Sequence, residues 1–490
     1  MSGKAFGFAR PFSNENTPLV AAPSPQTQHR RLFRCSLAVL GPGLLVSLAD
    51  TDAACLLEAA DSGARYGYSG LMGLQVLLCP VLFMAQELTV RLGTHTRQGH
   101  CACIRQHYGM AWTWVTTFLL LVSCVLAIVS ELAGIAGVCG MYGVPASAGA
   151  CLAAALLIAL VCAAPYRMVE LTGLTFGVFE LAFFVSWALA RPANDELFGS
   201  LFRFEGRPDF LFAAAANMGA VIMPWMIYFQ QSAVAAQRLR ATASASTRET
   251  TELTEAAERT GTLLGAIVTQ LVMLATMITF AATRSATRVR SIEDVASMHK
   301  AFAIAFGDAS GKALLACGIF GGSVCATIVV ASAASWALCD ALAKPPVRRD
   351  GGKASCEASS SGDAGGNPPE LPKKALFVEA AVVHDPESNP MDLPLWRAPA
   401  FYACYAGTVV AGLLALLVGA SQRQVSLVAL ISNAALVPIT LAFLWLLATN
   451  GRVLPDGARV TGGYKWLSAG VFSLASIFSM VGVASGLGMA

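Results

Sequence analysis

The chain has 490 residues, of which 56% are hydrophobic and only 13% charged, with a formal net charge of +3 and a mean hydropathy of +0.61. This composition excludes an ordinary soluble globular protein and places the chain among polytopic membrane proteins. The small basic excess gives no sign of a nucleic-acid partner. The sequence contains no GxxxxGK[ST], HExxH or GxSxG pattern, so we expect no nucleotide partner, no cofactor and no enzymatic activity.

The N-terminal residues 1–34 are polar and lack the apolar stretch of a signal peptide, so we expect a disordered cytoplasmic tail. A spanning helix needs about 20 mostly apolar residues, and eleven later segments meet this requirement. They lie near residues 36–59, 69–90, 112–133, 145–165, 171–190, 210–232, 261–283, 311–342, 398–420, 424–449 and 464–487.

Carboxylates interrupt the first span, which reads GPGLLVSLADTDAACLLEAA. An acid inside a span is costly, and its default interpretation is functional. Asp50 and Asp52 lie about 200° apart on a straight helix, so both face one point only if the helix unwinds. Cys55, three residues after Asp52, shares its face. An unwound turn would also expose the carbonyls of Ala49 and Thr51, giving oxygen and sulfur donors that suit a divalent cation.

The loop after the second span contains the only close cysteine pair, Cys101 and Cys103, beside His100. Their spacing is one residue shorter than the CxxC of zinc sites, and no second half follows. We interpret this stretch as a basic cytoplasmic loop in preference to a zinc site.

Groups that could relay protons through the membrane are few. Glu131, in the third span, lies among small residues where helices pack closely. It is either an ion or proton relay or a buried, hydrogen-bonded acid. None of the six histidines falls inside an expected span, which leaves no histidine relay.

A proline interrupts the sixth span, AAANMGAVIMPWMIYFQQSA. Pro224 lacks an N–H and clashes with the carbonyl of Ala220, so we expect that carbonyl to be a free ligand. Met223 lies on the same face as Ala220 and offers a thioether. Spans 1 and 6 hold corresponding positions in two five-span halves, and a disrupted helix in each half indicates an ion site at the bilayer midplane.

Residues 343–396 are rich in Gly, Ser and Pro and lack hydrophobic periodicity. We expect a disordered cytoplasmic insert there, between transmembrane helices 1–8 in residues 35–342 and helices 9–11 in residues 397–490. A cytoplasmic N-terminus places most Lys and Arg on the cytoplasmic side, as the positive-inside tendency requires, and leaves the C-terminus non-cytoplasmic. The sequence specifies neither the membrane nor an oligomer.

These features together resemble the natural resistance-associated macrophage protein (NRAMP) family of divalent-metal transporters. Family members carry Gly-Pro-Gly and then an Asp-Pro-Gly-Asn turn in their first helix; residues 41–43 read GPG here, and residues 52–55 read DAAC. The sixth helix of the family carries Ala-x-x-Met-Pro-His, and residues 220–225 read AVIMPW.

The resemblance implies an all-α, LeuT-like fold of eleven transmembrane helices, in which two inverted five-helix repeats carry broken helices 1 and 6. It implies a secondary transporter that moves divalent metal ions across the bilayer by alternating access. Asp52, the carbonyl of Ala220 and the thioether of Met223 would then bind the metal ion as cargo.

The departures from the family pattern bear on ion choice and coupling. Cys55 replaces the turn's Asn, and Asp50 is an additional acid. Trp225 and Gln230 occupy the two histidine positions linked to proton handling, and Glu131 matches at most one of two acids in the third helix. This combination resembles the divergent NRAMP-related magnesium-transporter branch and implies weak or absent proton coupling.

We therefore predict a carrier of Mg²⁺, Mn²⁺ or both. One alternative is a proton-coupled Fe²⁺ or Mn²⁺ symporter, which Met223 favours because soft sulfur suits those metals better than Mg²⁺. Another is an ion-coupled organic-solute symporter on the same fold, although two acids in helix 1 would repel a substrate carboxylate. A metal sensor would need a structured cytoplasmic domain, which residues 343–396 do not resemble.

Overall fold

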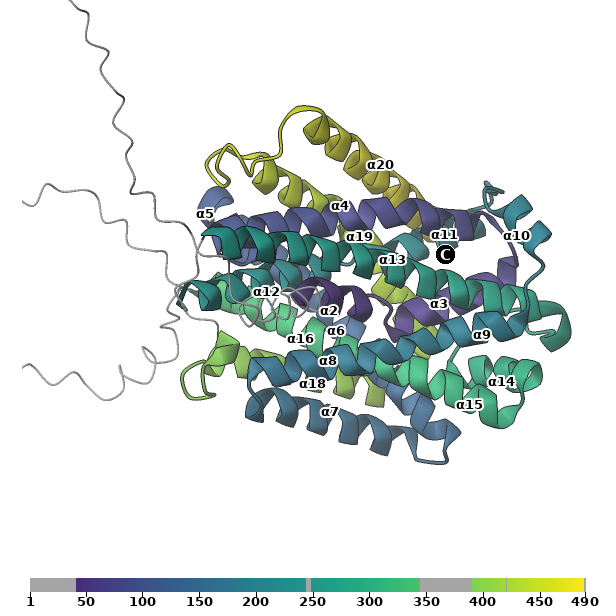
Figure 1. Ribbon diagram of the computed structural model, residues 1–490. Helices are drawn as coiled ribbons and strands as arrows, with labels where there is room; N and C mark the ends of the chain where they lie inside the picture. Colours follow the sequence, from purple (N-terminus) through teal and green to yellow (C-terminus); the bar gives the residue numbers. More distant parts are fainter. Residues whose placement is uncertain (1–40, 244–247, 344–389, 420, 489–490) are drawn as a thin grey trace, which may run out of the picture.

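The computed structural model describes residues 41–243, 248–343, 390–419 and 421–488, and these are helical without any strand. Most helices run side by side along one direction (Figure 1). Ten helices or helix series in this part of the chain are long and apolar enough to cross a membrane. They are α4 (Gly70–Thr96), α6 (Met110–Met141), α7 (Ala146–Ala163), α8 (Tyr166–Gly177) with η1 (Val178–Leu181) and α9 (Ala182–Ala190), α11 (Pro208–Val221) with α12 (Pro224–Ala243), α13 (Arg248–Thr287), α15 (Asp308–Leu315) with η2 (Ala316–Phe320) and α16 (Gly321–Leu342), α18 (Pro399–Leu417), α19 (Gln422–Thr449) and α20 (Gly462–Leu487).

The first predicted span is present as two short helices, α2 (Pro42–Ala49) and α3 (Ala53–Tyr66). Neither reaches spanning length alone, and they are not among these ten, but residues 42–66 together are long enough to be the eleventh crossing that the sequence predicts. The predicted end at residue 59 is wrong, because α3 continues to a glycine, Gly67, whose positive φ of 64° terminates the helix. Helices α3, α9, α13 and α18 all terminate at the same end of the molecule. We call this end the α3 end of the bundle.

Three shorter helices were not expected from the sequence: α5 (His100–Tyr108), α10 (Asn194–Ser200) and α14 (Val295–Phe306). Each is too short to produce a spanning hydropathy signal. A capping box starts α14. The Asp294 side chain accepts the backbone N–H of Ser297, and the Ser297 side chain accepts the backbone N–H of Asp294. The predicted tail 1–34 lies outside the described residues, as do residues 344–389 of the predicted insert. The described end of that insert contains a 3₁₀ turn, η3 (Pro390–Asp392).

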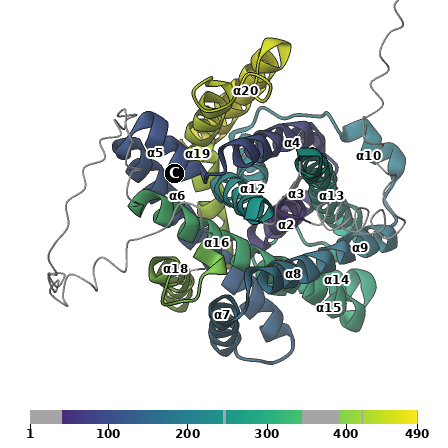
Figure 2. The same ribbon diagram turned by 60° about the vertical axis from the view of Figure 1, so that its left-hand side comes forward.

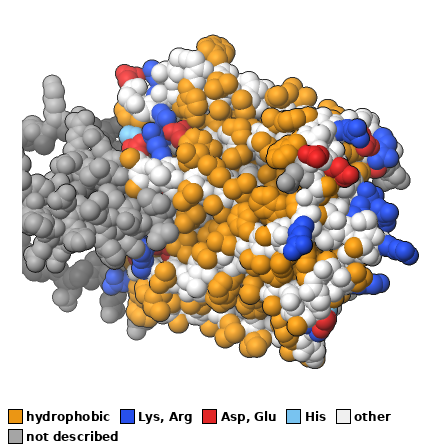
Figure 3. Space-filling view, turned by 45° about the vertical axis from the view of Figure 1, so that its right-hand side comes forward, with side chains coloured by type: hydrophobic (Ala, Val, Ile, Leu, Met, Phe, Trp, Pro, Cys, Tyr) orange, Lys and Arg blue, Asp and Glu red, His pale blue; other side chains and the backbone are white. Residues whose placement is uncertain are grey.

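Helices α2 and α3 lie inside the bundle. Figure 2 shows α2 enclosed by α4, α12, α13 and α16, whereas α7, α18 and α20 lie at the periphery. Contacts between helices agree with the picture, because α13 packs on α2, α3 and α4, while α16 packs on α6 and α12. Hydrophobic side chains cover the middle of the visible surface and charged ones gather near its two ends (Figure 3). The molecule is thus an integral, multi-pass membrane protein with two disrupted helices in its interior.

Candidate functional site

The break in helix 1 lies between α2 and α3 and consists of Asp50, Thr51 and Asp52. Asp52 is extended, with φ −71° and ψ 175°, and its carboxylate accepts the backbone N–H of Cys55 at 2.8 Å. An aspartate in this position caps a helix, because it satisfies a free N–H and faces the positive end of the helix dipole. The alanines that replace proline and glycine in the turn therefore do not prevent the break that the acids predict.

The break in helix 6 lies between α11 and α12, at Ile222 and Met223. Pro224 begins α12 and has no N–H to donate to the carbonyl of Ala220. That carbonyl instead lies 3.3 Å from the thiol sulfur of Cys55, a geometry in which the thiol donates. The two breaks therefore meet at one point, and Met223 is fully buried in the second of them.

Asp50 is fully buried, and neither of its carboxylate oxygens has a hydrogen-bond partner within the described residues. A buried charge without a partner is strongly unfavourable, and such a group is a natural ligand for a cation. The carbonyl of Ala49, in the last turn of α2, belongs to the set that a helix end leaves without intrahelical donors. The neighbouring Thr51 is held by a different contact: its hydroxyl donates a hydrogen bond to the carboxylate of Glu180.

Two further carboxylates complete a ring of acids around the helix 1 break. Glu131 on α6 accepts the N–H of Ala53 at 3.1 Å, at the start of α3. Glu180 in η1 accepts the hydroxyl of Thr51. Asp50, Asp52 and these two glutamates are all at least 99% buried, and none forms an ion pair within the described part of the chain. Four acids without a basic partner in a low-dielectric interior repel one another and favour a divalent cation.

Close helix packing fixes this ring. A Cβ atom at Gly322 of α16 would lie 2.8 Å from the Thr51 carbonyl oxygen and 2.9 Å from a Glu180 carboxylate oxygen. Small residues let membrane helices approach this closely. Glycine at position 322 is thus required for Glu180 to reach Thr51.

The donor set is mixed in character. Within the described residues, no group of three or more His, Cys, Asp and Glu is arranged to hold a metal ion. What the fold brings together is the Asp52 carboxylate, the Cys55 thiol and the Ala220 carbonyl, with Met223 three residues further along. The candidate site therefore includes a backbone oxygen and a thioether sulfur, which are not among the His, Cys, Asp and Glu side chains considered above.

The altered proton-path positions hold groups that do not titrate. Trp225 is fully buried, and its indole N–H has no partner among the described residues. Gln230 accepts the hydroxyl of Thr89 at 2.6 Å and donates to that of Thr262 at 3.1 Å. One expectation needs correction: His95 lies within a span, because α4 extends five residues beyond its predicted end of 90 to reach it. It lies in the last turn, away from both breaks.

The predicted loop that contains Cys101 and Cys103 is instead the buried helix α5. Cys101 contacts the Thr117 hydroxyl at 2.8 Å, whereas Cys103 accepts from Gln231 at 3.4 Å, so the two thiols have different partners. Burial raises the pKa of each thiol to about 12 and lowers the pKa of His100 to about 4. Both thiols are therefore protonated at neutral pH in the metal-free protein. The absence of a zinc site stays a prediction.

The sequence pattern did not reveal the ion pair that joins α3 to α19 near the α3 end of the bundle. Asp61 on α3 accepts from Arg423 of α19 at 2.8 Å and from the backbone N–H of Ile292 at 2.8 Å. A small cavity lined by Glu58, Asp61 and Arg423 lies beside this pair. The available signal was the spacing of Glu58 and Asp61, two acids three residues apart on one helix face.

The fold and the site together define a multi-pass membrane protein with two broken helices that meet over buried acids. The family model described as natural resistance-associated macrophage protein-like matches residues 43–349, which is more than half of the chain. The chain belongs to this family.

Several relatives in this family are similar to the chain. The divalent metal cation transporter MntH of Mesorhizobium japonicum is 28% identical over 237 residues, which are 46% of this chain and 50% of that protein. MntH of Ralstonia nicotianae is 29% identical over 303 residues, 59% of this chain and 66% of the relative. The chain thus spans about half to two thirds of the length of these relatives.

Solved structures support the fold. A manganese transporter of Eremococcus coleocola superposes with a TM-score of 0.67 at 14% identity, covering 93% of this chain and 87% of that one. MHP1, a nucleobase-cation-symport-1 family transporter, gives a TM-score of 0.50 at 12% identity. These are transporters of the LeuT-like type, so the fold is the predicted inverted repeat.

Proposed function

We propose that the protein is a secondary transporter of divalent metal cations that works by alternating access, and not an enzyme. The contact between the two helix breaks carries this proposal: the Cys55 thiol lies 3.3 Å from the Ala220 carbonyl, beside the Asp52 carboxylate. Broken helices at the midplane supply the carboxylate and carbonyl ligands that cations need. The similar proteins MntH of Mesorhizobium japonicum and of Ralstonia nicotianae are named divalent metal cation transporters, which supports the same class.

We propose that both Mn²⁺ and Mg²⁺ are carried. Of the four buried acids, Asp50 and Asp52, together with the Ala220 carbonyl, would supply the hard oxygen that Mg²⁺ prefers, whereas Cys55 and Met223 would supply sulfur that Mn²⁺ tolerates and Mg²⁺ does not. Because Mg²⁺ dehydrates reluctantly, it would keep waters between itself and these sulfur atoms. A substrate carboxylate would meet the same four acids and be repelled, which disfavours an organic-anion symporter.

Proton coupling should be weak. Tryptophan and glutamine stand at the two histidine positions of the family motif, and neither Trp225 nor Gln230 titrates near neutral pH. The remaining candidate relays are the buried acids Asp50, Glu58, Glu131 and Glu180. Of these, Glu131 already accepts a hydrogen bond from Ala53 at 3.1 Å. We further propose that the N-terminus is cytoplasmic, so that the α3 end of the bundle faces the opposite side.

Uptake into proteoliposomes tests this function. Mg²⁺, Mn²⁺ and Ca²⁺ would be supplied separately, with and without an imposed pH gradient, and protein-free liposomes would serve as the control. We expect Mn²⁺ and Mg²⁺ uptake above the control in both conditions. Absence of uptake for every divalent cation would refute the proposal, whichever direction the gradient takes.

A proton-sensitive dye inside the same vesicles tests coupling. We expect little acidification while Mn²⁺ or Mg²⁺ enters. Strong, metal-dependent acidification would contradict weak coupling, and its disappearance in Glu131→Gln would identify Glu131 as the relay.

A further inference from the structure

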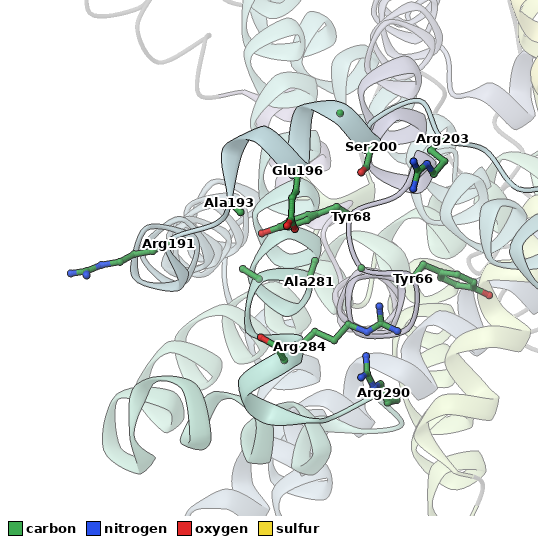
Figure 4. Close-up of a pocket in the computed structure, with 14 residues that line it drawn as sticks. Tyr66, Tyr68, Arg191, Ala193, Glu196, Ser200, Arg203, Ala281, Arg284 and Arg290 are labelled. Carbon is green, nitrogen blue, oxygen red and sulfur yellow. The ribbon is translucent and has the colours of Figure 1, made fainter.

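A second cavity lies at the α3 end of the bundle, away from the acid ring, and has a volume of about 830 Å³. The end of α3 with the connection to α4, the short helix α10 with its flanking segments, and the last turns of α13 form its walls (Figure 4). It shares none of its lining with the two helix breaks. Nothing in the proposed transport cycle requires it.

The charge of this cavity is positive. Arg203, Arg284 and Arg290 line it together with Arg191, whose side chain extends away from the other three (Figure 4), and Glu196 is the single carboxylate among its lining residues. Figure 4 shows Arg284 and Arg290 next to each other, Arg203 on the opposite wall, and Glu196 turned toward Tyr68. Within the described residues, no ion pair involves any of these three arginines. Guanidinium groups gathered without a carboxylate repel one another unless an anion lies between them.

Helix dipoles account for only part of this cluster. Arg284 is in the last turn of α13, where a cation stabilises the helix end, and it also donates to the carbonyl of Arg65 at 3.0 Å. Arg203 and Arg290, by contrast, lie in connecting segments outside the helices. Their positions have no such structural reason.

The segment above the cavity has the character of a membrane-interface anchor. Phe198 on α10 is 70% exposed, and Phe202 and Phe204, which follow it, are 63% and 47% exposed. A short polar helix with protruding aromatic side chains lies in the plane of the bilayer surface, with those side chains in the acyl boundary. This pattern indicates that the cavity, of which α10 forms one wall, lies at the depth of lipid headgroups.

We propose that this cavity binds the phosphate-bearing headgroup of an anionic phospholipid. Arginine forks match phosphate oxygens in pairs of hydrogen bonds, and basic pockets between membrane helices bind acidic headgroups. The hydroxyl of Ser200, on the same wall as Arg203 (Figure 4), is a further donor. The same positive charge repels a divalent cation, so this cavity is not an entrance for cargo.

Lipid binding to the purified, delipidated protein tests the proposal. Phosphatidylglycerol, phosphatidylcholine and free glycerol phosphate would be added separately, and bound lipid would be counted by native mass spectrometry alongside thermal unfolding. The variant is R203Q/R290Q, with R290Q alone as a milder form. The control is R207Q, at the same end of the molecule, because Arg207 already pairs with Glu205 at 2.8 Å.

We expect one tightly retained phosphatidylglycerol and a higher unfolding temperature, with little effect of phosphatidylcholine. Loss of two arginines should weaken retention on the order of tenfold or more, while R207Q retains the lipid as the unmodified protein does. Equal retention of both lipids, or equal loss in R207Q, would overturn the proposal. Stabilisation by glycerol phosphate with no additional effect of the lipid would identify a free-anion site and overturn the lipid assignment.

Discussion

Helix 1 and helix 6 are both interrupted inside the bundle, but different parts of the chain support the two interruptions. In helix 1, side chains satisfy the exposed backbone: Asp52 accepts from the N–H of Cys55, and Glu131 accepts from that of Ala53. In helix 6, Pro224 removes a donor and leaves the Ala220 carbonyl to the Cys55 thiol.

The two breaks therefore contribute different kinds of group to the candidate site: helix 1 contributes charged groups, and helix 6 contributes uncharged ones. The helix 1 break brings formal negative charge, and its acids both hold the backbone and face the candidate site. The helix 6 break brings a carbonyl dipole and a thioether but no charge. Substitutions in helix 1 should therefore affect binding of every divalent cation, whereas substitutions in helix 6 should affect affinity and ion choice.

The largest effect is expected from Asp52. In Asp52→Ala, uptake of both Mn²⁺ and Mg²⁺ should fall to the level of protein-free liposomes, because the site loses the carboxylate that binds the cation. The same substitution also removes the cap of α3. Asp52→Asn is the matched control, since asparagine caps a helix as well as aspartate does. It should fold like the unmodified protein and still fail to transport. Transport by Asp52→Asn near the unmodified rate would show that the charge is dispensable.

Pro224 tests the other break. Pro224→Ala introduces an N–H four residues after Ala220, which can then donate to its carbonyl and continue the helix. One hydrogen bond of about 1.4 kcal/mol should lower apparent affinity roughly tenfold. Pro438→Ala, inside α19, is the control for proline removal elsewhere. If concentration dependence of uptake is the same in all three proteins, the free carbonyl does not bind the cation.

Substitutions of Glu131 test whether the helix 1 break is stabilised by the hydrogen bond that the Glu131 carboxylate accepts from Ala53. Glu131→Ala and Glu131→Gln both remove a charge, but only glutamine retains an oxygen that can accept from Ala53. The alanine variant should therefore be less stable by about 1–3 kcal/mol, the cost of an unsatisfied buried donor. Unfolding temperatures of the two variants in detergent measure the difference. Identical temperatures would mean that Ala53 finds another acceptor.

The smallest effect is expected from Met223, and it concerns selectivity. Met223→Leu removes the sulfur with little change in volume, so Mn²⁺ uptake should fall a few-fold relative to Mg²⁺ uptake. Met226→Leu is the control, because that sulfur accepts from Gln86 at 3.3 Å and lies beyond the break. Competition between the two ions in proteoliposomes gives the ratio. An unchanged ratio in Met223→Leu would assign Met223 to packing.

Local sequence signals were enough to predict the crossings and both breaks. Hydropathy indicated each span, Pro224 indicated the break in helix 6, and Asp50 with Asp52 indicated the break in helix 1. Each break is indicated within one or two helical turns, and each span within its own stretch of about 20 residues, so these features depend on local sequence alone.

Contacts between distant segments could not be predicted in this way. The pairing of Thr51 with Glu180 joins residues 129 apart, and that of Cys55 with Ala220 joins residues 165 apart. Both depend on how helices pack, and the first also requires a glycine at position 322. The Asp61–Arg423 pair depends in addition on the length of α3, which the hydropathy pattern underestimated because charged residues fill its last turns.

The position of the helix 1 break also has a mechanical consequence. Helix α2 has 8 residues and α3 has 14, so the break divides a rod into arms of about 12 and 21 Å. If the chain bends at Asp50–Asp52, a rotation by a given angle moves the far end of α3 nearly twice as far as it moves the far end of α2. Asp61 lies on α3 only about 13 Å beyond the break, so equal rotations move Asp61 and the tip of α2 by similar distances, and the far end of α3 moves most.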